Sequence, residues 1–84
     1  MIIFYQRYYR KPRGRATRCE WLAVCNCVAL PDAFSFVVLI ENEVNLLSDI
    51  CLRVNQSRDG LRLQEVFNPI EISPSEFNSL RKLA

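Results

Sequence analysis

The strongest local signal in this chain of 84 residues is the stretch Ile72-Ser73-Pro74-Ser75-Glu76-Phe77. Ser73 and Glu76 match the capping box, in which the serine hydroxyl accepts a hydrogen bond from the backbone N–H of the glutamate. Pro74 stands at the first helical position, where the N–H that proline lacks would have no helical partner in any case. The stretch therefore predicts that a helix begins directly after Ser73.

Apolar residues continue this helix at helical spacing. Phe77, Leu80 and Leu83 recur every three residues and form one apolar stripe. Ile72 precedes the cap and pairs with Phe77 as a hydrophobic staple. A helix over residues 73–83 is too short to be stable in isolation, so we expect its stripe to pack on a sheet.

The residues before this helix favour β-strands, because they are rich in β-branched and aromatic side chains. The segment 44–54 is expected to be a strand with a bulge near Ser48, since Ile50, Leu52 and Val54 alternate after it. Ser57-Arg58-Asp59-Gly60 is a hairpin-turn signal. The predicted strands are 2–9, 19–30, 34–41, 44–54 and 61–67.

Together these elements predict an α+β fold, with an antiparallel sheet of four to five strands and one C-terminal helix at 73–83. Half of the residues are hydrophobic and only two are glycine, which fits a single folded domain over 1–84. We divide it into a basic-aromatic segment, 1–18, the sheet, 19–67, and the helix. Segment 34–41 is apolar on both faces, and one helix covers only one face of a sheet, so we expect a homodimer.

Charge is divided unevenly along the chain. Residues 1–18 carry six of the eleven Lys and Arg residues and no acid, which gives +6. Residues 19–84 carry the other five bases and all nine acids, which gives −4. A basic segment beside an acidic body indicates a polyanionic partner, either a nucleic acid or an acidic protein surface.

Catalysis is not expected from this composition. The chain has no histidine, the commonest general base and metal ligand. Glu41, Glu43 and Asp49 lie near one connection, but they match no metal motif and are interpreted as a solvated turn. We therefore predict that the protein is not an enzyme and uses no cofactor and no metal.

No feature indicates a membrane or a secretion pathway. The uncharged run at 21–30 is half the length that a membrane-spanning helix needs. The N-terminus places apolar residues before its arginines, which is the reverse of a secretion signal. We expect a protein of the cytoplasm, or of the host cytoplasm if it is viral.

The four cysteines are Cys19, Cys25, Cys27 and Cys51, and their spacing fits no common zinc motif. If 19–30 is a strand, the first three lie on one face together with Trp21. We interpret the cysteines as reduced core residues. The alternatives are a metal or redox site based on Cys25 and Cys27, or structural disulfides.

Aromatic and basic residues interleave in the N-terminal segment, as they do where cations bind phosphates and aromatic rings stack on unpaired bases. In a strand, Tyr5, Arg7 and Tyr9 share one face. Phe4 and Tyr8 share the other. The alternative is an edge strand that packs its rings inward and keeps its arginines in water. The predicted nucleic-acid-binding residues, which include a basic hairpin around Gly14, are Tyr5, Arg7, Tyr8, Tyr9, Arg10, Lys11, Arg13, Arg15 and Arg18.

The C-terminal part resembles a known family. The runs Gly60-Leu61-Arg62-Leu63-Gln64-Glu65-Val66-Phe67 and Ile70-Glu71-Ile72-Ser73-Pro74-Ser75-Glu76-Phe77, with Leu80, are similar to the final strand and helix of the p15 transcriptional-coactivator family. The likeness covers residues 50–84. It implies a dimeric domain that binds single-stranded DNA along its sheet. This chain departs from the family because 19–30 and 34–40 contain no Lys or Arg, so nucleic-acid contacts are expected from 5–18 and 53–62.

Two functions follow from these observations. The first is a small non-catalytic module that binds single-stranded DNA or RNA through its N-terminal Arg and Tyr residues. The second is a protein-interaction module, an adaptor or a virus-encoded inhibitor, that uses the basic segment or a sheet edge against an acidic partner. The charge of the N-terminal segment fits both.

Overall fold

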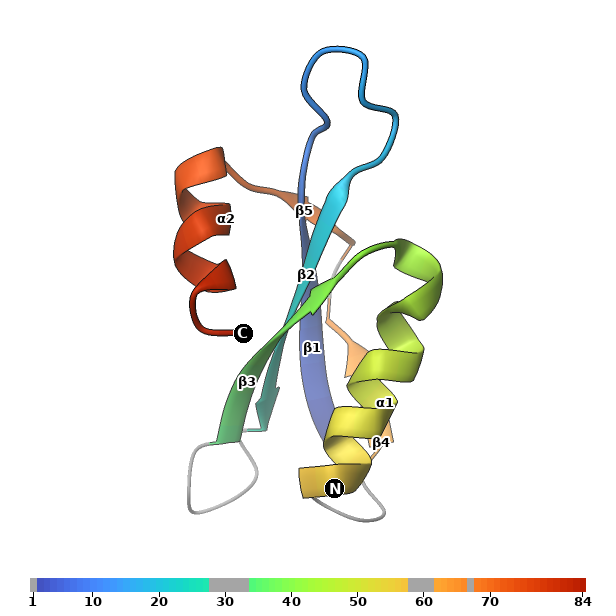
Figure 1. The fold of residues 1–84 in the computed structure, drawn as a ribbon. Coiled ribbons are helices and arrows are strands. Elements are labelled where there is room, and N and C mark those ends of the chain that lie inside the picture. The colour runs from blue at the N-terminus through green and yellow to red at the C-terminus, as the bar shows by residue number, and fades with distance from the viewer. Residues whose placement is uncertain (1, 28–33, 58–61, 67) are drawn as a thin grey trace.

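The computed structural model describes residues 2–27, 34–57, 62–66 and 68–84. Within them the fold is α+β, with a five-stranded sheet and two α-helices (Figure 1). The predicted turns at 31–32 and 58–60 lie outside the described residues. The elements in chain order are β1 (Ile2–Arg10), β2 (Glu20–Cys27), β3 (Phe34–Ile40), the 3-10 turn η1 (Glu43–Asn45), α1 (Leu46–Ser57), β4 (Arg62–Glu65), β5 (Ile70–Glu71) and α2 (Pro74–Arg81).

Strand β1 lies in the middle of the sheet. On one side it pairs with β2 in antiparallel fashion, and β2 pairs with β3 in the same way. On its other side β1 pairs first with β4 and then with β5, and both of these strands run parallel to it. The predicted antiparallel sheet is therefore confirmed for β1, β2 and β3 and wrong for β4, while β5 lies outside the predicted strands. The interpretation of the first segment as an edge strand is wrong too.

The parallel direction of β4 results from a helix that stands where the sequence predicted a strand. Residues 44–54 were expected to be a strand, but they form the end of η1 and most of α1. The Asn42 side chain accepts a hydrogen bond from the Asn45 N–H at 3.2 Å and caps the turn. A helix between β3 and β4 returns the chain in the same direction, whereas a tight hairpin would have reversed it.

Burial decides between helix and strand in this segment. Leu46, Ile50 and Val54 recur every four residues, and each is at most 2% exposed. Leu52, which a strand would place on the same face as Ile50, is 57% exposed. The alternation of Ile50, Leu52 and Val54, which predicted a strand, therefore does not describe the buried face. The four-residue repeat of Leu46, Ile50 and Val54 faces the sheet and buries apolar surface.

The two helices cover opposite faces of the sheet (Figure 1). Under α1 lies one core cluster, which includes odd-numbered residues of β1 and β2. Under α2 lies a smaller cluster of Leu22, Val37 and Phe77, with Tyr8 and Ile72 at its border. The uncovered face that motivated the homodimer prediction is therefore occupied by α1, so this reason for a dimer no longer holds. The members of the α1 cluster are Ile3, Tyr5, Ala23, Cys25, Val38, Ile40, Leu46, Ile50 and Val54.

Helix α2 begins where the sequence predicts. Ser73 is the N-cap, and its hydroxyl accepts from the Glu76 N–H at 3.2 Å. Phe77 is fully buried. The helix ends at Arg81, two residues before the predicted end, and Leu83 is 71% exposed. Leu83 therefore does not belong to the packed stripe.

The cysteines divide into different environments. Cys25 is buried among the residues that α1 covers, and burial raises its pKa from an ordinary value of 9.0 to about 12. Cys19 is half-buried, whereas Cys51 is exposed on α1. These three are free thiols, and the Cys27 side chain lies outside the described part. The prediction of core cysteines is confirmed for Cys25 and wrong for Cys51, because residue 51 lies on the exposed side of a helix.

The packing of α1 can be tested by truncating side chains on its two faces. We expect Ile50→Ala to lower the free energy of unfolding by about 2–5 kcal/mol, because it removes fully buried methyl groups. Leu52→Ala, on the exposed side of the same helix, is the matched control and should change stability by less than about 0.5 kcal/mol. Urea denaturation measures both variants. Equal effects would contradict the helical register given above.

The cysteine environments can be tested by alkylation of the folded protein with iodoacetamide, followed by peptide mass spectrometry. We expect rapid modification of Cys51 at about pH 8 and protection of Cys25, because the thiolate is the reactive form. The raised pKa of Cys25 also contributes stability that is fully present below pH 9.0 and lost as the pH rises toward 12. A Cys25→Ala variant should therefore show a shallower loss of stability over that range. Equal alkylation rates at both residues would contradict the burial of Cys25.

Candidate nucleic-acid interface

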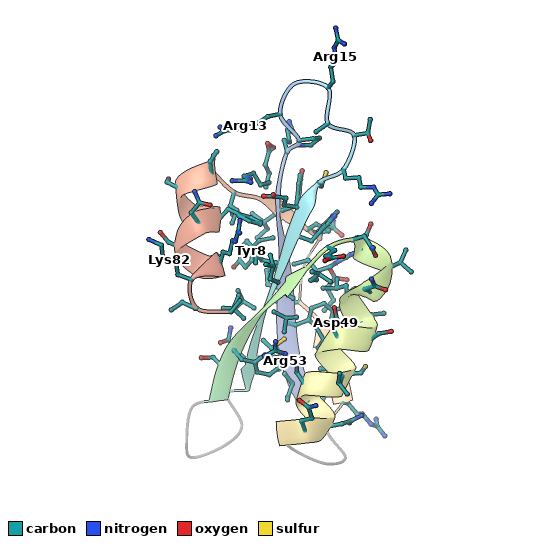
Figure 2. All side chains as sticks on the ribbon, in the orientation of Figure 1. Tyr8, Arg13, Arg15, Asp49, Arg53 and Lys82 are labelled. Carbon is teal, nitrogen blue, oxygen red and sulfur yellow. The ribbon has the colours of Figure 1, made fainter. Side chains whose placement is uncertain are left out.

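The connection between β1 and β2 is a hairpin loop, residues 11–19, that extends beyond the sheet (Figure 2). Its turn is closed by a hydrogen bond from the Ala16 N–H to the Arg13 carbonyl at 3.2 Å. Gly14 has a φ of 60°, the left-handed conformation that glycine adopts without a steric penalty. The sequence prediction of a hairpin around Gly14 is thus confirmed, and the turn holds Arg15 at the tip (Figure 2).

Three arginines of this hairpin are exposed and have no ion-pair partner among the described residues. They are Arg13, Arg15 and Arg18. Unpaired guanidinium groups on a projecting loop are available for bidentate contacts with phosphate oxygens. The hairpin therefore concentrates the free positive charge of the N-terminal segment.

The other predicted cations are paired within the molecule. Arg7 donates to Glu65 from Nε at 2.6 Å and from Nη2 at 3.1 Å, and it also pairs with Glu43. The hydrogen bonds to Glu65 raise the pKa of Arg7 above its ordinary value. Arg10 pairs with Glu20, and Lys11 pairs with Glu71 at 3.3 Å. Arg7 is therefore a structural cation, because its guanidinium is already satisfied by two carboxylates.

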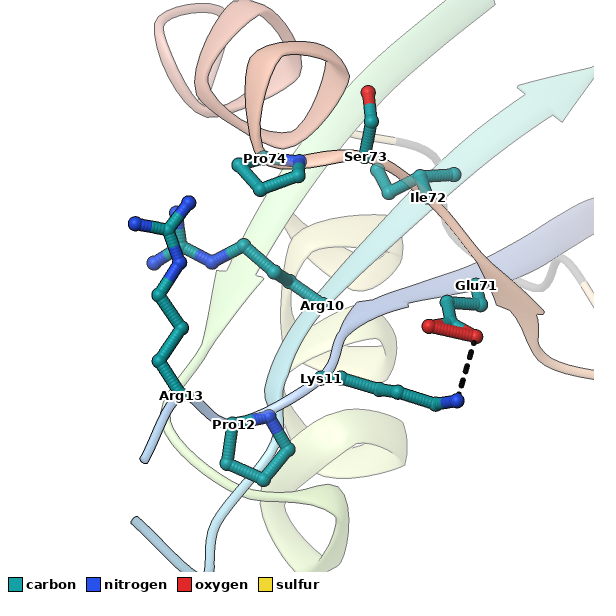
Figure 3. Close-up of a pocket in the computed structure, with 8 residues that line it drawn as sticks. All are labelled: Arg10, Lys11, Pro12, Arg13, Glu71, Ile72, Ser73 and Pro74. Atoms are coloured by element: carbon teal, nitrogen blue, oxygen red, sulfur yellow. Dashed lines mark ion pairs between the residues drawn. The ribbon is translucent and has the colours of Figure 1, made fainter. Parts of the chain in front are cut away.

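At the base of the hairpin is a cleft of about 460 Å³ between the end of β1 and the segment that leads into α2 (Figure 3). Three of its lining residues are basic and one, Glu71, is acidic. Arg10 lies with its guanidinium carbon 4.7 Å from the centre of the Phe77 ring, so packing on that ring holds it in place. The cleft is cationic overall, and Arg13 supplies its unpaired charge, because Arg10 is paired with Glu20 and Lys11 with Glu71. Its lining residues are Arg10, Lys11, Pro12, Arg13, Glu71, Ile72, Ser73 and Pro74.

The predicted aromatic residues are separated by the sheet. Tyr5 is 6% exposed in the core under α1, and burial raises its pKa. Tyr9 lies on the same face, with its ring centre 5.3 Å from that of Trp21. The predicted alternation of faces is confirmed, but Tyr5 packs in the core and Tyr9 packs on Trp21, so neither ring is placed to stack on a base. Tyr8, half-buried on the face that α2 covers, borders two cavities, and Tyr5 is also among the lining residues of the second.

Two further cavities continue from Tyr8 along this face. One, of about 410 Å³, lies between Tyr8 and α2 and shares Ile72 with the basic cleft. The other, of about 280 Å³, shares Tyr8 with it and includes Phe4, Gln6 and Asn26. Since neighbouring cavities share lining residues, the three form a row that ends at the hairpin. We call this row the α2-side groove.

Sequence reasoning missed Gln6 and Asn26 as candidate site residues. The available signal was the parity of β1, which places Phe4, Gln6 and Tyr8 on one face. A polar amide between two aromatic rings on one strand face is a candidate contact position. Asn26 follows from the register, because it stands opposite Phe4 on β2.

The described residues contain no group of three or more Cys, Asp or Glu side chains arranged to hold a metal ion. None of their helices combines the length and hydrophobicity needed to cross a bilayer.

Comparisons with models of protein families, with curated proteins and with solved structures found no match. They therefore do not test the resemblance to the p15 transcriptional-coactivator family. The candidate interface rests on the geometry of this chain alone.

Proposed function

We propose that the protein binds single-stranded nucleic acid, with its phosphates on the hairpin and on the cationic cleft at the hairpin's base. The observation that carries this proposal is the set of three exposed, unpaired arginines, Arg13, Arg15 and Arg18, on a loop that projects from the sheet. Arginine and lysine contacts to phosphate supply the larger, sequence-independent part of nucleic-acid affinity.

A single strand fits the surface better than a duplex does. The α2-side groove continues from the cationic cleft past Tyr8 to Phe4, and both rings are half-buried. Aromatic rings recognise bases that are unstacked, and the bases of a duplex are stacked on one another. A strand with its phosphates at the hairpin would bring its bases over these rings.

The contribution of the hairpin can be measured by salt-dependent binding of a labelled single-stranded oligonucleotide. We expect the Arg13→Ala/Arg15→Ala double variant to bind more weakly at low salt, and its log–log salt slope to be less steep by about 1.4, since two phosphate contacts are lost. Fluorescence anisotropy over a range of salt concentrations gives both quantities.

Arg53→Glu is the matched control for charge. It changes the net charge by the same two units, but it lies on α1, away from the hairpin and on the sheet face opposite α2 (Figure 2). The contacts that the sequence suggested from 53–62 are therefore not part of this proposal, and Arg53→Glu tests that exclusion. We expect it to leave the salt slope unchanged, since no phosphate contact is removed. If wild-type protein at about 10 µM does not bind the oligonucleotide in about 50 mM salt, the proposed function is wrong.

A protein-interaction function is the second candidate, and the edge strand β3 favours it. Its sequence, Phe-Ser-Phe-Val-Val-Leu-Ile, contains no charged residue and no proline, the usual features that protect a sheet edge. Such a strand can pair with an extended segment of another chain. Protection of β3 amides from hydrogen exchange that increases with protein concentration, without oligonucleotide binding, would favour this candidate.

A further inference from the structure

The cavity at the far end of the α2-side groove differs in chemistry from the cationic cleft. It has a volume of about 280 Å³ and lies on the α2 side of β1. None of its lining residues carries a charge, and most are apolar or aromatic. A phosphate would find no cation there. The lining residues are Phe4, Tyr5, Gln6, Tyr8, Asn26, Val66 and Ile70.

Gln6 holds an unused hydrogen-bond acceptor beside this cavity. Its side-chain Nε2 donates to the carbonyls of Arg7 and Asn68, each at 3.0 Å. Because two carbonyl oxygens flank Nε2, the orientation of the amide is fixed by its partners. Oε1 is consequently the end without a partner, and it is the one buried side-chain nitrogen or oxygen of the described residues that lacks a hydrogen bond.

An orphaned acceptor of this kind indicates a missing donor. Gln6 is only 9% exposed, so bulk water does not replace the partner. Buried polar groups are nearly always hydrogen-bonded, and each exception calls for an explanation. Oε1 is itself buried, so a ligand N–H would supply the donor only when the side chains that cover Oε1 move aside as the ligand enters between Phe4 and Tyr8.

The walls define the rest of the ligand. Phe4, Gln6 and Tyr8 are alternate residues of one strand, so the two rings flank the amide at about 7 Å on either side along β1. Val66 and Ile70 are 41% and 42% exposed and give the cavity apolar walls on its other side. Asn26, opposite Phe4 on β2, is exposed and can both donate and accept. A neutral, planar ring system with an N–H on its edge matches these walls.

We propose that this cavity is a nucleobase pocket, in which one unpaired base of a bound strand stacks on Phe4 or Tyr8 and donates an N–H to Gln6 Oε1. The inference rests on the proposed function and deepens it, because the pocket joins the cationic cleft through cavities that share Tyr8 and Ile72. The groove thus has a cationic end for phosphates and a neutral end for a base.

The test compares two single strands of about eight nucleotides with equal numbers of phosphates. One carries bases and the other is abasic throughout. We expect the base-bearing strand to bind about 5- to 100-fold more tightly, which is the gain in affinity that stacking of one base on an aromatic ring provides. Tyr8→Ala should abolish most of this ratio, whereas Tyr8→Phe should retain it. The salt slope should be the same for all three proteins, because stacking releases few ions.

Tyr9→Ala is the matched control, since Tyr9 packs on Trp21 at the opposite face. It should leave the ratio unchanged. A second measurement needs no variant: the side-chain amide resonances of Gln6 should shift when a neutral nucleoside is added to wild-type protein, and should not shift when ribose is added. This readout keeps the proposal testable if Tyr8→Ala fails to fold.

The outcomes separate the pocket from the function. Equal affinity for the base-bearing and abasic strands, with a normal salt slope, would overturn the base pocket and leave the phosphate-binding function intact. Failure of both strands to bind would overturn the function and the pocket together. Gln6 resonances that do not respond to any nucleoside would also overturn the pocket.

Discussion

The pairing of β1 on both of its edges is the constraint on which the rest of the structure depends. Three of the four other described strands, β2, β4 and β5, hydrogen-bond to it. Its odd-numbered residues enter the core under α1, and its even-numbered residues face α2. A strand with neighbours on both sides and a helix over each face is fixed in the fold, which explains why the N-terminal segment is not a free basic arm.

The central position of β1 also explains why its arginines form ion pairs within the molecule. Arg7 stands in the middle of the strand with 18% of its side chain exposed, and Glu65 and Glu43 reach it from β4 and η1. Removing one member of such a partly buried pair leaves an uncompensated charge. The ion pairs of Arg7 therefore link the stability of β1 to the positions of β4 and η1. The carboxylates of residues 19–84 therefore do more than balance the charge of the basic segment. They hold β4, β5 and η1 against the cations of β1 and the residue that follows it.

Unpaired positive charge is consequently found on the hairpin, and uncharged accessible surface is found at the far end of the α2-side groove. Helix α2 has eight residues and leaves part of its sheet face open around Phe4 and Tyr8. The hairpin, by contrast, projects beyond both helices (Figure 1). The division gives the molecule a cationic end and a neutral end along one face, and the proposed binding mode assigns phosphates to the first and a base to the second.

Local sequence determined those features whose hydrogen bonds close within a few residues. The start of α2 depends on Ser73 and Glu76, three residues apart, and the hairpin depends on Arg13, Gly14 and Ala16. The alternation of faces on β1 and β2 also follows from the sequence, because the strand period is fixed by the backbone. These signals were sufficient to predict the fold class, the position of the arginines on a hairpin, and the placement of Tyr8 on the opposite face of β1 from Tyr5 and Tyr9.

Tertiary structure alone decided the features that join distant residues. Segment 44–54 contains both a two-residue and a four-residue apolar repeat, and only packing against the sheet selects the helix. The parallel direction of β4 follows from that helix. The pairing of Arg7 with Glu65 spans 58 residues, and the hydrogen bond from Gln6 to Asn68 that leaves Oε1 unpaired spans 62. No local pattern encodes which carboxylate or carbonyl lies opposite a side chain across the sheet, because that choice is made by the register of strands and the burial of apolar surface.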